Sequence, residues 1–145
     1  MNDADRALLA ELRRHLLQLH KLLIDWQRAE YERTHGRLQT MQLLNVIFDD
    51  PAFAWLRTMS GLIVRVDEAL EAKPPDVPRR SSLDDSRAEE GTGPLMAQAR
   101  KLVAPEPGSP YEQRYHAAMQ EVPDVILAHR ELVTLLKLQR PASNA

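Results

Sequence analysis

The sequence predicts an all-α fold, a helical bundle with long N-terminal helices, a mobile linker and shorter C-terminal helices interrupted by prolines. Apolar residues recur at three- and four-residue intervals in three separate stretches, as on the buried face of an amphipathic helix. No stretch alternates apolar and polar residues like a strand, and no Asn-Gly or Asp-Gly turn signals a hairpin. A chain of 145 residues is the size of one domain, so we expect residues 1–145 to form a single helical domain.

The first helix is expected to begin near Asp3 or Asp5, because either residue could cap it. Its apolar stripe has coiled-coil-like spacing and consists of Leu9, Leu12, Leu16, Leu19, Leu23 and Trp26. After a polar stretch, the apolar pattern resumes at Leu38, Met41, Leu44 and Phe48. A continuous helix over residues 3–48 would be ~69 Å long, which is too long for a compact domain of this size. We therefore expect a break at Gly36, since glycine tolerates the left-handed conformation of a helix C-cap.

The second helix has a clear predicted start, with Asp50 as N-cap and Pro51 in the first turn. Its stripe consists of Ala52, Leu56, Met59, Ile63, Val66 and Leu70. Gly61 lies inside this helix, at a cost of about 1 kcal/mol relative to alanine. One interpretation of this glycine is that it allows a neighbouring helix to approach closely.

The C-terminal half begins with residues 73–93, which contain three prolines and almost no large apolar residue. This composition predicts a flexible internal linker. A short helix should follow, with the apolar residues Leu95, Met96, Ala99, Leu102 and Val103. A capping box at residues 109–112 predicts a helix that ends near residue 121. Pro123 then kinks or restarts the helix, and the last helix should end before Pro141. Its predicted inward residues are Val122, Val125, Ile126, Leu132, Val133 and Leu136.

Composition excludes several classes of function. The chain has no cysteine, which excludes disulfides, cysteine-based metal sites and thiol nucleophiles. The net charge of −2 comes without a basic stripe, so we expect no nucleic-acid partner. No apolar run approaches the ~20 residues that span a bilayer, and the N-terminus lacks the features of a signal peptide. We therefore expect a cytoplasmic protein without a membrane partner.

Three histidines of the first helix raise the question of a metal site. His15 and His20 are five residues apart, or ~140° around a helix axis. His20 and His35 lie ~22 Å apart along that axis. The three side chains therefore cannot form one site within a single helix. The simpler interpretation of His15, His20 and Glu32 is a solvated helix face.

A second metal hypothesis rests on the pair Glu32 and His35. Their Glu-x-x-His spacing occurs in ferritin-like di-iron bundles, which need a second copy of the motif. Glu112 and His116 are one residue too far apart to supply it. The sequence therefore predicts no metal and no cofactor, with Glu32, His35, His116 and His129 as the candidates to examine.

His129 differs from the other histidines because it lies on the apolar stripe of the last helix. A single histidine in that position is most often a buried, hydrogen-bonded core residue. The alternative is a ligand or proton acceptor that faces His116 or an inward acid such as Asp67. The chain contains no Gly-x-Ser-x-Gly elbow, phosphate-binding loop or dinucleotide fingerprint, so we expect a non-enzymatic protein with no catalytic residue.

An interaction surface is predicted on the second helix, where Phe53, Trp55 and Leu62 widen the apolar face to about half of the circumference. Phe53 and Trp55 are two residues apart and point to different sides of a helix. Exposed aromatic residues mark interaction sites more often than catalytic ones. We expect the first two helices to leave apolar surface uncovered and the chain to form a homodimer, with Trp55 as the exposed anchor.

Residues 48–70 and 123–137 together resemble small uncharacterised bacterial helical proteins. The resemblance implies a helical fold and carries no activity or site residue. The leading hypothesis is a non-enzymatic cytoplasmic helical protein that acts through protein–protein interaction, as a homodimer or with an unidentified protein partner. The alternative hypothesis is a metal- or small-ligand-binding bundle that uses inward histidine and glutamate residues.

Overall fold

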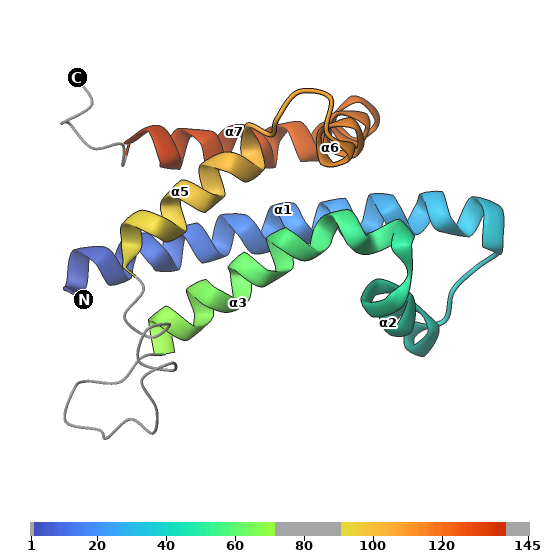
Figure 1. The fold of residues 1–145 in the computed structure, drawn as a ribbon, viewed down its shortest axis with the longest axis horizontal. Helices are drawn as coiled ribbons and strands as arrows, with labels where there is room; N and C mark the ends of the chain where they lie inside the picture. Colours follow the sequence, from blue (N-terminus) through green and yellow to red (C-terminus); the bar gives the residue numbers. More distant parts are fainter. Residues whose placement is uncertain (1, 72–90, 139–145) are drawn as a thin grey trace.

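The computed structural model describes residues 2–71 and 91–138, and every regular element in these ranges is helical. The predicted all-α fold is therefore confirmed (Figure 1). The elements are α1 (Asp3–His35), α2 (Thr40–Asp49), the 3-10 helix η1 (Pro51–Leu56), α3 (Arg57–Glu71), α5 (Thr92–Val103), α6 (Pro110–Glu121) and α7 (Pro123–Leu138). Most of the predicted linker, residues 73–93, lies outside the described ranges. Its last two residues belong to α5.

The N-cap of helix α1 lies one residue before Asp3, the first of the two predicted caps. Asn2 is the N-cap, and its side-chain oxygen accepts a hydrogen bond of 2.7 Å from the backbone N–H of Asp5. The helix ends at Gly36, as predicted, where φ is +84° and the backbone N–H donates to the carbonyl of Glu32. This turn separates α1 from α2, so the two helices do not form one continuous rod.

The second predicted helix divides into two parts. Asp50 caps it, accepting a hydrogen bond of 2.8 Å from the N–H of Ala52, but the first six residues form the 3-10 helix η1 before α3 begins. Side chains three residues apart eclipse one another in a 3-10 helix. Phe53 and Leu56 therefore point the same way, and both are buried.

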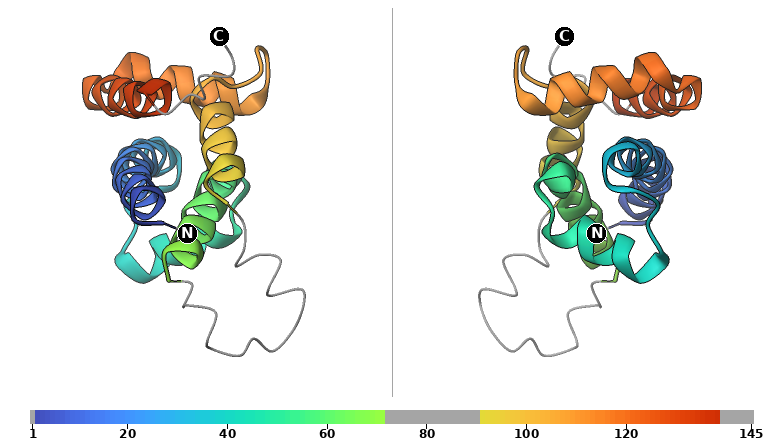
Figure 2. Two further views of the ribbon diagram at one scale, coloured as in Figure 1. Left: turned by 90° about the vertical axis from the view of Figure 1, so that its left-hand side faces the viewer. Right: turned by 90° about the vertical axis from the view of Figure 1, so that its right-hand side faces the viewer.

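The helices pack in two layers around α1. An end-on view shows α1 beneath α7 on one side and α3 beneath α5 on the other, with α6 running across the top (Figure 2). The predicted stripe of α1 faces this interior, and its members Leu9, Leu12, Leu16, Leu19, Leu23 and Trp26 are all buried. Among the described residues, no helix is both long and apolar enough to cross a membrane.

The predicted interaction residues are not left uncovered in this fold. Phe53 and Leu62 are each 1% exposed and belong to the core. Trp55 is half-buried, and its ring meets Trp26 and Tyr111 edge-on. The expectation that these residues lie on a free surface is wrong, because the C-terminal helices cover the apolar faces of α1, η1 and α3 within one chain.

Candidate functional site

His129 and His116, two of the metal candidates, have different surroundings. The Nδ1 atom of His129 lies 2.7 Å from the hydroxyl oxygen of Tyr115, and Tyr115 is fully buried. Burial lowers the pKa of His129, and the charge of His116 lowers it further. His116 itself is exposed, with Nδ1 3.7 Å from a carboxylate oxygen of Glu112. His129 therefore forms a hydrogen bond inside the molecule, whereas the neighbouring His116 lies at the surface.

Glu32 and His35, the other two candidates, close the end of α1. A carboxylate oxygen of Glu32 accepts a 2.7 Å hydrogen bond from the backbone N–H of Leu38, and this bond is the main reason why the pKa of Glu32 is lowered. The imidazole of His35 stacks on the ring of Tyr31 with centroids 4.0 Å apart. Within the described ranges, no three histidine or acidic side chains are grouped so that they could hold a metal ion.

His20 is not on a solvated face, contrary to the sequence-based expectation. Its Nε2 atom lies 2.7 Å from the hydroxyl oxygen of Ser60 on α3. The Ser60 hydroxyl donates its own proton to the carbonyl of Leu56, so the imidazole N–H donates to Ser60. Burial lowers the pKa of His20. His20 is therefore a neutral residue of the α1–α3 interface.

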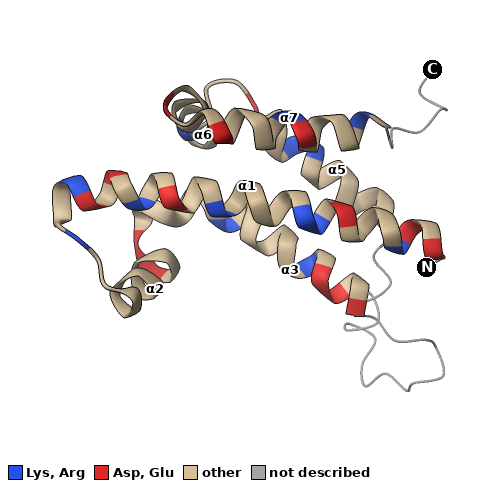
Figure 3. Ribbon diagram, turned by 180° about the vertical axis from the view of Figure 1, so that it is seen from behind, with Lys and Arg blue, Asp and Glu red and all other residues tan. Residues whose placement is uncertain are grey.

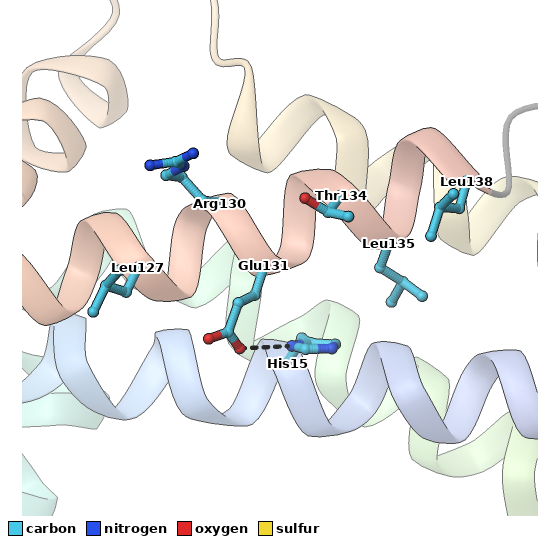
Figure 4. A pocket seen from close by; sticks show the side chains of 7 residues that line it. All are labelled: His15, Leu127, Arg130, Glu131, Thr134, Leu135 and Leu138. Carbon is cyan, nitrogen blue, oxygen red and sulfur yellow. Dashed lines mark ion pairs between the residues drawn. The ribbon is translucent and has the colours of Figure 1, made fainter.

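An open groove of about 460 Å³ runs between α1 and α7 (Figure 4). Its lining combines apolar and charged side chains, namely His15, Leu127, Arg130, Glu131, Thr134, Leu135 and Leu138. Leu127 is 57% exposed and Leu138 is 74% exposed, and both project from the same side of α7 toward the groove. A concave surface lined by exposed leucines is suited to receive an apolar side chain from another molecule.

His15 forms the α1 wall of this groove and is also more buried than the sequence suggested. Its Nδ1 atom lies 3.7 Å from a carboxylate oxygen of Glu131 and has no hydrogen-bond partner in the part of the chain that the structure describes. Its Nε2 atom lies 3.3 Å from a guanidinium nitrogen of Arg14 and 3.6 Å from a carboxylate oxygen of Glu11. The two carboxylates face opposite edges of the ring, so they do not converge on one cation.

Helix α2 presents a second apolar surface. Met41 and Phe48 are 71% and 72% exposed, and Leu44, between them on the same face, is also exposed. The opposite face carries Leu43, Val46 and Ile47, which are partly buried against the core. Sequence reasoning assigned Met41, Leu44 and Phe48 to a resumed apolar pattern, but it could not show that this face points outward. We call these three residues the outer face of α2.

Charged residues are distributed unevenly between the helices that form the groove and helix α2 (Figure 3). Residues of both signs alternate along α1, whereas the α2 ribbon is uncharged until its carboxyl end, where Asp49 lies. The groove carries Arg130 among its lining residues. Among residues 2–71 and 91–138, neither the side chain of Asp49 nor that of Arg130 takes part in a hydrogen bond or ion pair.

The chain matches no protein-family model, no curated protein and no solved structure. The resemblance of residues 48–70 and 123–137 to small bacterial helical proteins therefore stays a prediction.

Proposed function

We propose that this chain is a non-enzymatic, cytoplasmic helical protein that acts through protein–protein interaction and associates with itself. The observation that carries the proposal is the exposure of large apolar side chains on two separate surfaces, the groove between α1 and α7 and the outer face of α2. Exposed apolar residues scattered singly are normal in a monomer, but grouped ones mark interaction sites.

The chemistry of the described residues supports interaction more than catalysis. Three histidines contact a hydroxyl or a carboxylate across a helix interface: His20 joins α1 to α3, His15 joins α1 to α7 and His129 joins α7 to α6. Each of these contacts stabilises packing and does not present a reactive atom to a substrate. The alternative hypothesis of a metal- or small-ligand-binding bundle has less support, since its candidates Glu32 and His35 lie at the end of α1, away from His116 and His129 on α6 and α7, and no three such ligands are grouped in the described part of the chain.

Self-association is tested by sedimentation velocity over ~1–100 μM, a range that brackets weak and stable interfaces. We expect the sedimentation coefficient to rise with concentration toward the value of a dimer. A matched variant, Phe48→Ser with Leu127→Ser, removes one exposed side chain from each surface and should remain monomeric with unchanged helical circular dichroism. A natural sequence that stays monomeric up to ~100 μM contradicts the proposal.

A further inference from the structure

We infer that the groove between α1 and α7 receives helix α2 from a second copy of this chain. This inference rests on the self-association proposed above and names the two surfaces that meet. The occupant would lay Met41, Leu44 and Phe48 against the exposed leucines of α7, which is the helix-in-groove mode of recognition.

The dimensions of the two surfaces agree. Helix α2 has ten residues and is therefore about 15 Å long. The exposed leucines of the groove, Leu127 and Leu138, are eleven residues apart on α7, a separation of about 16 Å along the helix. The spacing of Met41, Leu44 and Phe48 places all three on one side of α2. A single helix of this length can thus fill the groove from one leucine to the other.

Helix α2 cannot occupy the groove of its own chain. It lies beneath the carboxyl-terminal end of α1 and packs mainly against η1 (Figure 1). The groove opens beside His15, in the first half of α1. Both surfaces therefore stay uncovered within one chain, and a second copy supplies each with the surface that it lacks.

Charge complementarity fixes the direction of the inserted helix. Asp49 ends α2, where the negative end of the helix dipole adds to its charge. Arg130 lies at the Leu127 end of the groove, and neither residue has a partner among the residues that the structure describes. Placing Asp49 beside Arg130 sets α2 antiparallel to α7 and leaves its amino-terminal end near Leu138.

Reciprocal exchange closes this arrangement into a dimer. Helix and groove are different surfaces of one chain, so a two-fold axis can place each α2 in the groove of the other copy. Both pairs of apolar surfaces are then buried together, and no groove is left open to recruit a third copy.

The experiment uses two variants that each lose one surface. The helix variant carries Met41→Ser and Phe48→Ser, and the groove variant carries Leu127→Ser and Leu138→Ser. Each alone should raise the dimer dissociation constant by at least about 30-fold, the effect of losing a buried interface anchor. An equimolar mixture should form a heterodimer, because the groove variant still offers an intact α2 to the intact groove of the helix variant.

A charge exchange tests the direction of insertion. Asp49→Arg and Arg130→Asp should each weaken the dimer by about two- to fivefold, as for an exposed ion pair. The protein that carries both substitutions should recover the affinity of the natural sequence. Recovery is not expected if the two residues lie far apart in the dimer.

The outcomes separate this inference from the proposed function. If the unmodified protein is monomeric, both the proposed self-association and the inferred arrangement are overturned. A dimer weakened only by the groove variant points to pairing of α7 with α7 and overturns the inference alone. A dimer weakened only by the helix variant points to pairing of α2 with α2 and also overturns the inference alone. A mixture of the two variants that fails to form a heterodimer overturns the inference as well.

Discussion

The hydrogen bond between Tyr115 and His129 joins α6 to α7 inside the molecule. Burial raises the pKa of Tyr115, so its hydroxyl stays protonated, and it is hydrogen-bonded to Nδ1 of His129. His129→Leu removes this partner and leaves a buried hydroxyl unpaired. We expect the free energy of unfolding to fall by about 1–3 kcal/mol, measured by urea denaturation.

The control for this prediction is the same substitution in a Tyr115→Phe background. There the hydroxyl is already absent, so His129→Leu should cost less, and the difference gives the coupling between the two side chains. An equal cost in both backgrounds would show that the hydrogen bond contributes nothing to stability.

Single residues were predicted well where their role depends on their own helix and poorly where it depends on another. His129 was interpreted as a buried, hydrogen-bonded core residue, and it does bond to Tyr115, although it is only half-buried. Gln27, in contrast, stood at the start of a polar stretch, yet it is 2% exposed. Its side-chain oxygen accepts hydrogen bonds from Trp55 on η1 and Arg114 on α6. Partners that lie 28 and 87 residues away leave no pattern in the local sequence.

At the scale of elements, the ends of helices were predicted more reliably than their surroundings. Gly36 ends α1 and Asp50 begins η1, because glycine and capping side chains act through neighbouring backbone groups. The expectation that Gly61 admits a neighbouring helix was wrong, since nothing lies within 4 Å of the position that a Cβ atom would take there. The sequence shows that residue 61 is a glycine, but it does not show whether another helix packs against that position.

Alanine substitutions at Gly36 and Gly61 should change the stability of the protein in opposite directions. Gly36 has φ +84° and ψ 170°, a region open essentially to glycine alone, so Gly36→Ala should destabilise the protein by about 1–3 kcal/mol. Gly61 has helical neighbours and free space, so Gly61→Ala should stabilise it by about 0.5–1 kcal/mol. Thermal unfolding of both variants checks the opposite signs, and a shift in the same direction for both would contradict the assignment.

For the whole molecule, the sequence predicted the class of fold but not which apolar faces remain free. The stripes of α1 and α3 were recognisable, and the crossing of α5, α6 and α7 over them was not (Figure 2). The sequence predicted exposed apolar surface at Trp55, which is half-buried in the structure. The exposed apolar side chains are instead Phe48 and Leu127, among others. Deciding which amphipathic helix is left without a partner requires the packing of all the helices together.

Stability should fall as the pH is lowered from about 7 to 5, because two half-buried histidines resist protonation in the folded state. Burial lowers the pKa of His20 and of His129 from the ordinary value of 6.5. Below that value the unfolded chain binds protons that the folded chain does not, so acid favours unfolding, and above it neither state is charged at these positions. Urea unfolding at several pH values in this window measures the slope.

The comparison protein carries His20→Gln and His129→Gln, and its free energy of unfolding should vary less over the same window. The slope is the readout, because both substitutions also change absolute stability by removing hydrogen bonds. His15, His35 and His116 are present in both proteins, so the difference between the two slopes belongs to His20 and His129. Carboxylates titrate mainly below about pH 5 and contribute little to this difference. Equal slopes, or a natural sequence that becomes more stable in acid, would mean that His20 and His129 are already accessible to protons in the folded bundle.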